Sequence, residues 1–256
     1  MICGMTYYQI CWYFLIYSFG GWALEVVYHA VACGKVINRG FLNGPVCPVY
    51  GFGVLSVFAM INTIQGGGYQ MNDGMIFLFG VILATAVELI AGWLLDVCFH
   101  ARWWDYSKRL LNINGRVCLL GAVVFGLFSV LLILMIHPVI CGWVDAVPIL
   151  YRRVLTVVIF AGFIVDTVSS VCGMVDFQKK MEEHAAALEK RKAIAIGRLK
   201  DSAAYETIKQ RRNTLSENLT YQQLRMIEAF PKLKLHRHND LLVELRKTIS
   251  KKRNQH

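Results

Sequence analysis

Five apolar runs in this chain are each long enough to cross a lipid bilayer as a helix, which takes about 20 residues. Short polar or glycine-rich segments separate the runs, and the pattern changes to a polar one after residue 175. The pattern therefore predicts an all-α, polytopic transmembrane helical bundle in residues 1–175. The five expected spans cover residues 8–32, 46–64, 75–98, 117–136 and 152–174.

Beyond residue 175, polar residues dominate and apolar ones recur at helical spacing. A loose heptad leads to a break at Ala229-Phe230-Pro231, and Asn239 or Asp240 then precedes an amphipathic segment that either residue can cap. Residues 176–256 are therefore expected to form a cytoplasmic helical tail. The heptad positions are Tyr205, Ile208, Leu215, Leu219, Gln222 and Met226, and the last helix places Leu242, Leu245 and Ile249 on one face.

Composition supports a membrane protein with a basic tail. The chain is 56% hydrophobic and 17% charged, whereas a soluble domain is about 25% charged. Residues 1–175 carry 8 Lys/Arg against 7 Asp/Glu, so nearly all of the +10 net charge lies in the tail, with 19 Lys/Arg against 10 Asp/Glu. Such a tail favours anionic lipid headgroups or an acidic partner. Nucleic acid is not expected, because no nucleic-acid-binding module is visible.

The positions of Lys and Arg also predict the orientation. They concentrate in the segments that follow the first and third spans and in the tail, whereas residues 62–74 contain none. Loops rich in Lys and Arg stay in the cytoplasm. The N-terminus is therefore expected outside and the tail inside, in a bacterial inner membrane, and an odd number of spans agrees with this.

Part of the first span recurs. Gly21 to His29 returns 71 residues later as Gly92 to His100, and at the same offset Asn43 to Cys47 returns as Asn114 to Cys118. A fainter third copy begins at Gly162. An offset of two spans preserves direction, so the chain is expected to contain a parallel helix-pair repeat whose third unit lacks its second helix. The missing helix would leave one side of the bundle uncovered, which predicts a homo-oligomer, most simply a dimer.

Four acids interrupt the apolar spans, and an ionised side chain near the bilayer centre costs roughly 2.5–3.5 kcal/mol. Such acids either line a transport pathway or pair with a base. Ion pairing fits Asp96 at least as well as a pathway role, whereas the deeper Glu88 favours function. If the repeat makes three of the acids equivalent, they surround one cytoplasm-facing cavity, with Arg39 near one acid and Glu88 at the floor. The three are Glu25, Asp96 and Asp166.

Two histidines, His29 and His100, each follow an acid by four residues and share its helix face. That spacing can hold a metal or relay protons, with Cys47 and Cys118 as further ligands. A lone interfacial histidine more often makes only a hydrogen bond. The chain also contains no Cys-x-x-Cys pair. We therefore expect neither a bound metal nor a cofactor.

The segment 38–53 is too rich in glycine and proline to be helical throughout. One interpretation is a partly re-entrant loop that presents carbonyls and helix-start amides to a solute, since irregular backbone at membrane depth lines cavities or is buried. The other is a tight turn that starts the second span. The candidate pathway residues here are Asn43, Gly44, Pro45, Cys47, Pro48 and Tyr50.

The first span and the segment after it contain Gly21-Trp22 followed by Glu25, then Asn38-Arg39-Gly40-Phe41-Leu42, and finally Gly44-Pro45, Cys47-Pro48 and Tyr50-Gly51-Phe52-Gly53. These motifs resemble those of the CmpB-like, or ABC-transporter type IV, family of bacterial membrane proteins. The segment 222–234 also looks like the C-terminal region of that family. The resemblance covers most of the chain and implies a role in transport.

The chain contains no phosphate-binding loop of the form Gly-x-x-x-x-Gly-Lys-Ser/Thr, so an ATPase would have to be a separate subunit. No nucleophile elbow is visible either, so an enzyme is not expected. The sequence favours a permease-like transport component with the buried acids and the Gly/Pro-rich segment as its pathway. The alternatives are an interaction protein whose tail docks a partner or anionic lipid, and a membrane enzyme that uses the acid–histidine pairs.

Overall fold

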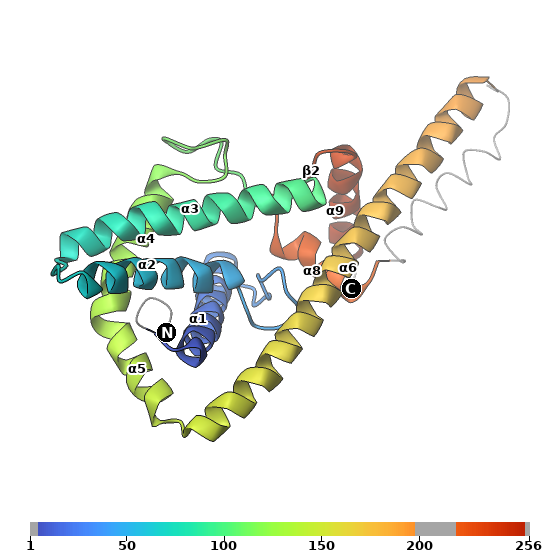
Figure 1. Cartoon of the computed structure of the whole chain (residues 1–256). Helices are drawn as coiled ribbons and strands as arrows, with labels where there is room; N and C mark the ends of the chain where they lie inside the picture. The colour runs from blue at the N-terminus through green and yellow to red at the C-terminus, as the bar shows by residue number, and fades with distance from the viewer. Residues whose placement is uncertain (1–4, 198–218, 254–256) are drawn as a thin grey trace. The chain divides into compact units, whose positions relative to one another are not determined.

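The structure is a computed structural model that describes residues 5–197 and 219–253. Its regular elements are almost all helical (Figure 1). The one sheet in the described residues pairs two antiparallel strands, β1 (Ala101–Arg102) and β2 (Lys234–Leu235). The helices are α1 (Tyr7–Cys33), α2 (Pro48–Gly66), α3 (Asp73–Phe99), α4 (Leu119–Leu131), the π-helical turn η1 (Leu132–Ile136), α5 (His137–Ala146), α6 (Ile149–Gly197), α8 (Tyr221–Ala229) and α9 (Asn239–Arg253).

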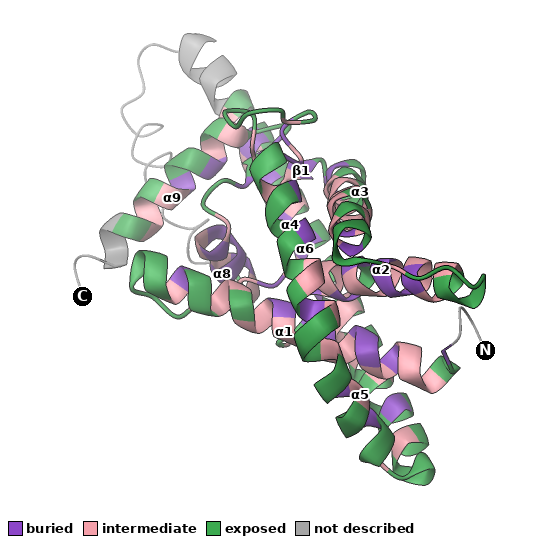
Figure 2. Ribbon diagram, turned by 90° about the vertical axis from the view of Figure 1, so that its left-hand side faces the viewer, coloured by how far each residue is buried: buried purple, intermediate pink, exposed green. Residues whose placement is uncertain are grey.

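The predicted all-α polytopic architecture is confirmed. Among the described residues, 5 helices are long and apolar enough to cross a membrane, with α4, η1 and α5 forming one continuous span. Many large apolar side chains on them are exposed, including Val124, Val157 and Val165, and exposed residues dominate α4 in Figure 2. Such extensive apolar surface fits contact with lipid.

One predicted boundary was wrong. The fourth span was expected to end at residue 136, but the helix continues to Ala146. Pro138 does not break it, because it lies in the first turn of α5, directly after a π turn in which the His137 amide bonds to the Leu132 carbonyl. The fifth expected span lies within α6, which continues to Gly197, and its end at residue 174 stays a prediction. Tyr205, Ile208 and Leu215 of the predicted heptad lie outside the described residues.

The chain divides into two compact units. Unit 1 consists of residues 1–94 and 104–168, and unit 2 of residues 95–103 and 169–256. The second unit thus includes the end of α3 and strand β1 as well as the C-terminal part of the chain. The expected division at residues 175 and 176 rests on composition alone and stays a prediction.

Close helix contacts in unit 1 depend on glycine. A Cβ atom at Gly51 of α2 would clash with the Ser18 hydroxyl and lie 2.7 Å from the Phe14 carbonyl oxygen of α1. A Cβ atom at Gly126 of α4 would lie 2.7 Å from the Phe77 ring of α3. Lipid tails are as apolar as leucine, so tight packing at small residues is a main source of helix association in membranes.

Unit 2 has its own apolar core. Buried side chains from α6, α8 and α9 include Phe177, Met226 and Leu242, and the Trp103 ring packs edge-on against Phe230 with centroids 4.9 Å apart. Helix α9 begins at Asn239, so the residue expected to cap the helix is its first helical residue instead, and Leu242 and Leu245 are buried. The apolar face of this amphipathic helix is therefore covered within its own unit, and Arg246 of the same helix donates to the Phe230 and Leu233 carbonyls over 2.9 and 3.1 Å.

The orientation of the chain remains a prediction, which accessibility of introduced cysteines tests. In intact cells, a membrane-impermeant maleimide should label Gln70→Cys, in the exposed connection between α2 and α3. It should label Lys232→Cys only after the cells are permeabilised. The unsubstituted protein, with its native cysteines, sets the baseline. Labelling of Lys232→Cys in intact cells would reverse the orientation and contradict the charge argument.

Candidate functional site

Glu25 of α1 is held by two partners at the start of α2 and in the α1–α2 loop (residues 34–47). The Tyr50 hydroxyl donates to Glu25 Oε1 over 2.7 Å, and Arg39 Nε lies 3.5 Å from Oε2. The Glu25 and Arg39 side chains are 32% and 23% exposed, so the ion pair is partly buried but still in contact with its surroundings. Because Tyr50 and Arg39 contact different oxygens of the carboxylate, Glu25 can lose one partner and keep the other.

The glycine one turn before Glu25 explains how Tyr50 reaches it. A Cβ atom at Gly21 would lie within 2.5 Å of Tyr50 Cβ and would clash with its ring. Gly21 and Glu25 share a helix face because they are four residues apart. The glycine therefore leaves a slot for the tyrosine ring, and the acid accepts the hydroxyl at the end of that slot.

Glu88 of α3 brings a second carboxylate to the same place. The Tyr106 hydroxyl is its hydrogen-bonding neighbour, and Glu25 is close enough to interact with it electrostatically. Burial, followed by the nearby Glu88 carboxylate, raises the pKa of Tyr106, so this hydroxyl keeps its proton and serves as a donor. We call this group the Glu25–Glu88 cluster; its members are Glu25, Arg39, Tyr50, Glu88 and Tyr106.

The α1–α2 loop is organised by Asn38. The Asn38 Oδ1 atom accepts hydrogen bonds from Trp22 Nε1 and from the Gly40 amide, each over 2.8 Å. Its Nδ2 atom donates to the Asn43 carbonyl, also over 2.8 Å. One side chain thus ties the loop both to α1 and to itself, which fixes where Arg39 can point.

Asp166 of α6 binds the same loop through its backbone. Its two carboxylate oxygens accept the Asn43 amide over 3.0 Å and the Gly44 amide over 2.8 Å. A Cβ atom at Gly44 would lie 3.0 Å from Asp166 Oδ2, so glycine permits this close approach. These two loop amides are therefore occupied by a side chain of the protein itself.

Asp96 lies in unit 2 and has different partners. Its Oδ1 atom is 2.5 Å from His236 Nε2, its Oδ2 atom is 3.8 Å from Arg102 Nε, and its side chain is 6% exposed. The His100 carbonyl accepts the His236 amide over 2.9 Å. Asp96 and His100 therefore join the end of α3 to the β2 segment.

Residues 12–171 match the family described as "Putative ABC-transporter type IV". The chain belongs to this family. The match includes Glu25, Glu88, Asp96 and Asp166 together with the whole α1–α2 loop. Family and helices together identify a multi-pass membrane protein related to ABC transporters. Neither the curated proteins nor the solved structures contain a match to the chain.

In this ABC-transporter type IV chain, the three acids aligned by the sequence repeat have different local partners. Glu25 pairs with Arg39 and Tyr50, Asp166 binds two backbone amides, and Asp96 pairs with Arg102 and His236. A cavity common to all three acids, and the repeat itself, stay predictions. The structure does bring Glu25 together with Glu88, which the repeat does not align.

The other predicted residues have mainly backbone roles. His29 is buried, with Nδ1 2.9 Å from the Lys35 carbonyl oxygen. Cys47 and Cys118 are the N-caps of α2 and α4. Pro48 is the first residue of α2, where its missing amide hydrogen costs nothing, and Pro45 lies in the irregular chain before it. In the part of the chain that the structure describes, no group of three or more His, Cys, Asp or Glu could hold a metal ion.

Sequence reasoning missed two groups of residues. It did not select Tyr106 as a partner of Glu88, because no spacing rule links a loop tyrosine to a helix 18 positions earlier. It also passed over His137 and Cys141, which were assigned to a loop. Their four-residue spacing was a usable signal, because it places both side chains on one face once the segment is helical.

Proposed function

We propose that this protein is a permease-like transport component whose solute-handling site is the Glu25–Glu88 cluster. One observation carries the proposal. Two carboxylates from separate apolar helices, α1 and α3, lie close enough to interact: Glu25 is bound by Arg39 and Tyr50, and Glu88 is next to Tyr106. Ionisable groups within membrane spans are costly and mark pathways for solutes or ions by default.

The composition of the cluster favours a cationic solute or a proton. The cluster holds two carboxyl groups and one base, Arg39, so it has one more group that can bind a cation or a proton than it has bases. Glu25 keeps its hydrogen bond from Tyr50 if a positively charged solute replaces Arg39. Such an exchange of partners lets a charge enter without leaving a carboxylate unpaired, which is the costly situation in a medium of low dielectric constant.

Energy for transport would come from a separate ATPase chain. Family membership supports this step, as does a sequence without a phosphate-binding loop. If the positive-inside rule holds, the α1–α2 loop and unit 2 face the cytoplasm, where ATP is available.

Glu88→Gln tests the proposed role of the cluster. The substitution keeps the shape and a hydrogen-bonding carbonyl but removes the charge. In cells that lack the native protein, Glu88→Gln should reach the membrane at normal levels and yet reproduce the solute imbalance of the deletion strain. The measurement is mass-spectrometric profiling of small cations and metabolites inside cells and in the medium. Asp73→Asn, at an exposed acid in the first turn of the same helix, should behave like the native protein.

Two results would contradict the proposal. If deletion changes no solute, the protein is not a transport component, and the interaction role becomes the better explanation. If deletion changes a solute but Glu88→Gln restores it fully, transport stands and the cluster is only a structural anchor.

A further inference from the structure

A second polar group lies where α5 meets α1 in unit 1. His137 Nδ1 is 2.8 Å from the Tyr17 hydroxyl, and His137 Nε2 is 3.3 Å from Cys141 Sγ. The Tyr13 hydroxyl is 3.2 Å from the same sulfur atom. Tyr13 and Tyr17 are buried, with exposed fractions of 3% and 6%. The imidazole and the thiol are therefore each bound by a buried tyrosine of α1.

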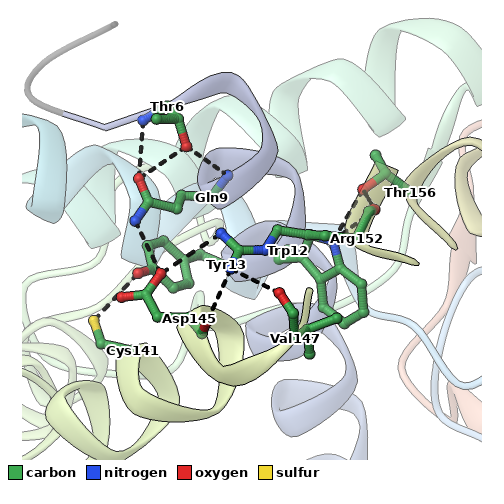
Figure 3. Close-up of polar contacts among 9 residues, drawn as sticks. All are labelled: Thr6, Gln9, Trp12, Tyr13, Cys141, Asp145, Val147, Arg152 and Thr156. Carbon is green, nitrogen blue, oxygen red and sulfur yellow. Dashed lines mark hydrogen bonds and ion pairs between the residues drawn. The ribbon is translucent and has the colours of Figure 1, made fainter. Parts of the chain in front are cut away.

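The chain builds this group from one helix face. His137, Cys141 and Asp145 follow one another at four-residue intervals on α5, so they share a face. The π turn η1 ends directly before His137, and π turns change the direction of the side chains that follow, frequently at functional sites. Figure 3 shows Cys141 reaching Tyr13 of α1 while Asp145 reaches Gln9 and Arg152.

We propose that His137 and Cys141 bind a thiophilic transition-metal ion of the Zn²⁺ class. Imidazole nitrogen and thiolate sulfur are the ligands that such ions prefer. With bonds of about 2.05 Å to nitrogen and about 2.3 Å to sulfur, two tetrahedral ligands of one ion lie about 3.5 Å apart. The observed 3.3 Å between Nε2 and Sγ is within a few tenths of an ångström of that separation.

Tyr17 gives the imidazole the orientation that a metal ligand needs. When Nδ1–H donates to the Tyr17 oxygen, Nε2 carries no hydrogen and its lone pair faces Cys141. Metal-binding histidines commonly use their other ring nitrogen in this way, and loss of that outer partner weakens metal binding about 10–100-fold. Tyr13 supplies a hydroxyl to the sulfur, as a hydrogen-bond donor to the thiolate or as an oxygen ligand.

The proposed site leaves coordination positions open. Two strong protein ligands leave positions for water or another exchangeable ligand, which distinguishes it from a closed structural zinc site. One turn beyond Cys141, Asp145 is 57% exposed and bound to Arg152 at 3.6 Å, so an exposed carboxylate stands at the end of the same helix face. The Cys141 thiol releases its proton to solvent when the ion binds.

Cobalt(II) is a suitable spectroscopic probe for a zinc site. The purified protein in detergent should bind one equivalent of Co²⁺ with a thiolate-to-cobalt charge-transfer band, and Zn²⁺ should displace the ion. The band should disappear in Cys141→Ser and in His137→Gln. Tyr17→Phe should weaken binding about tenfold, because it removes the outer partner of the histidine. Cys172→Ser, at an exposed cysteine on α6, should bind like the native protein.

A second measurement covers variants that fail to fold. In the native protein, Zn²⁺ should slow alkylation of Cys141 by a membrane-permeant maleimide at least tenfold, as peptide mass spectrometry can measure, while alkylation of Cys172 should not change. Absence of both protection and a saturable cobalt band would overturn the proposal. So would a cobalt band that persists in a folded Cys141→Ser protein. None of these results depends on whether the protein transports a solute.

Discussion

Gly21→Ala is expected to lower the stability of the protein by about 1–3 kcal/mol, the usual cost of forcing an extra methyl group into a packed site. The added Cβ atom would clash with the Tyr50 ring, whose own Cβ atom is 2.5 Å away. Either α1 and α2 separate, or Tyr50 rotates and its hydroxyl leaves Glu25. Thermal unfolding in detergent, followed by tryptophan fluorescence, should show a midpoint several degrees lower.

Gly20 provides a matched control one position earlier. A Cβ atom at Gly20 would meet nothing within 4 Å, so Gly20→Ala should leave the midpoint unchanged or raise it slightly. Alanine favours a helix over glycine by about 1 kcal/mol. In a Tyr50→Ala background, Gly21→Ala should cost less stability than in the native protein, because the clashing ring is absent, but it should still cost some, because the Cβ atom of residue 50 stays 2.5 Å from the added one. Equal midpoints for the Gly20 and Gly21 variants would disprove the slot.

The glycine–acid spacing illustrates what the sequence could and could not reveal. The repeat singled out Gly21 and Glu25, but the reason for the glycine is the ring of Tyr50, which only the fold brings to it. In the second copy, a Cβ atom at Gly92 would lie 3.1 Å from Trp104, whereas Gly162 in the third copy has nothing within 4 Å. The third glycine thus has no comparable contact, in line with the fainter similarity of that copy.

Hydrophobicity identified the spans well but their contacts poorly. In a soluble helix the apolar face reveals the core, whereas in a bilayer both the lipid-facing and the packed faces are apolar. Exposed Val165 and Asp166, which binds the α1–α2 loop, are neighbours on α6. Nothing in their pattern indicates which side the loop occupies. The partners of Glu25, Glu88 and Asp166 could therefore be named only from the structure.

Helix α5 was missed for a related reason. Pro138, Gly142 and Asp145 are residue types typical of a loop, and the π turn that accommodates the proline has no sequence signature. Once residues 137–146 are helical, His137, Cys141 and Asp145 lie in one row. The predicted end of the fourth span therefore hid the fact that these three residues lie on one helix face.

The anchoring of the α1–α2 loop by Asp166 leads to the last prediction. Asp166→Ala removes the acceptor of the Asn43 and Gly44 amides. A hydrogen bond to a charged group contributes about 1.5–3 kcal/mol, so losing two should cost about 3 kcal/mol or more and free the loop. Hydrogen–deuterium exchange of peptides covering residues 38–47 should become faster, and the thermal midpoint should fall.

Two further variants separate this anchor from a general effect on α6. Asp166→Asn keeps one oxygen that can accept one of the two amides, so its exchange rate and midpoint should lie between those of the native protein and Asp166→Ala. Thr167→Ala changes the next residue, whose hydroxyl donates to the Phe163 carbonyl of its own helix over 2.7 Å, and should leave the loop protected. If residues 38–47 exchange at the native rate in Asp166→Ala, the carboxylate does not hold the loop. Arg39 must then be positioned by other contacts, such as the hydrogen bond from Trp22 to Asn38 that ties the loop to α1.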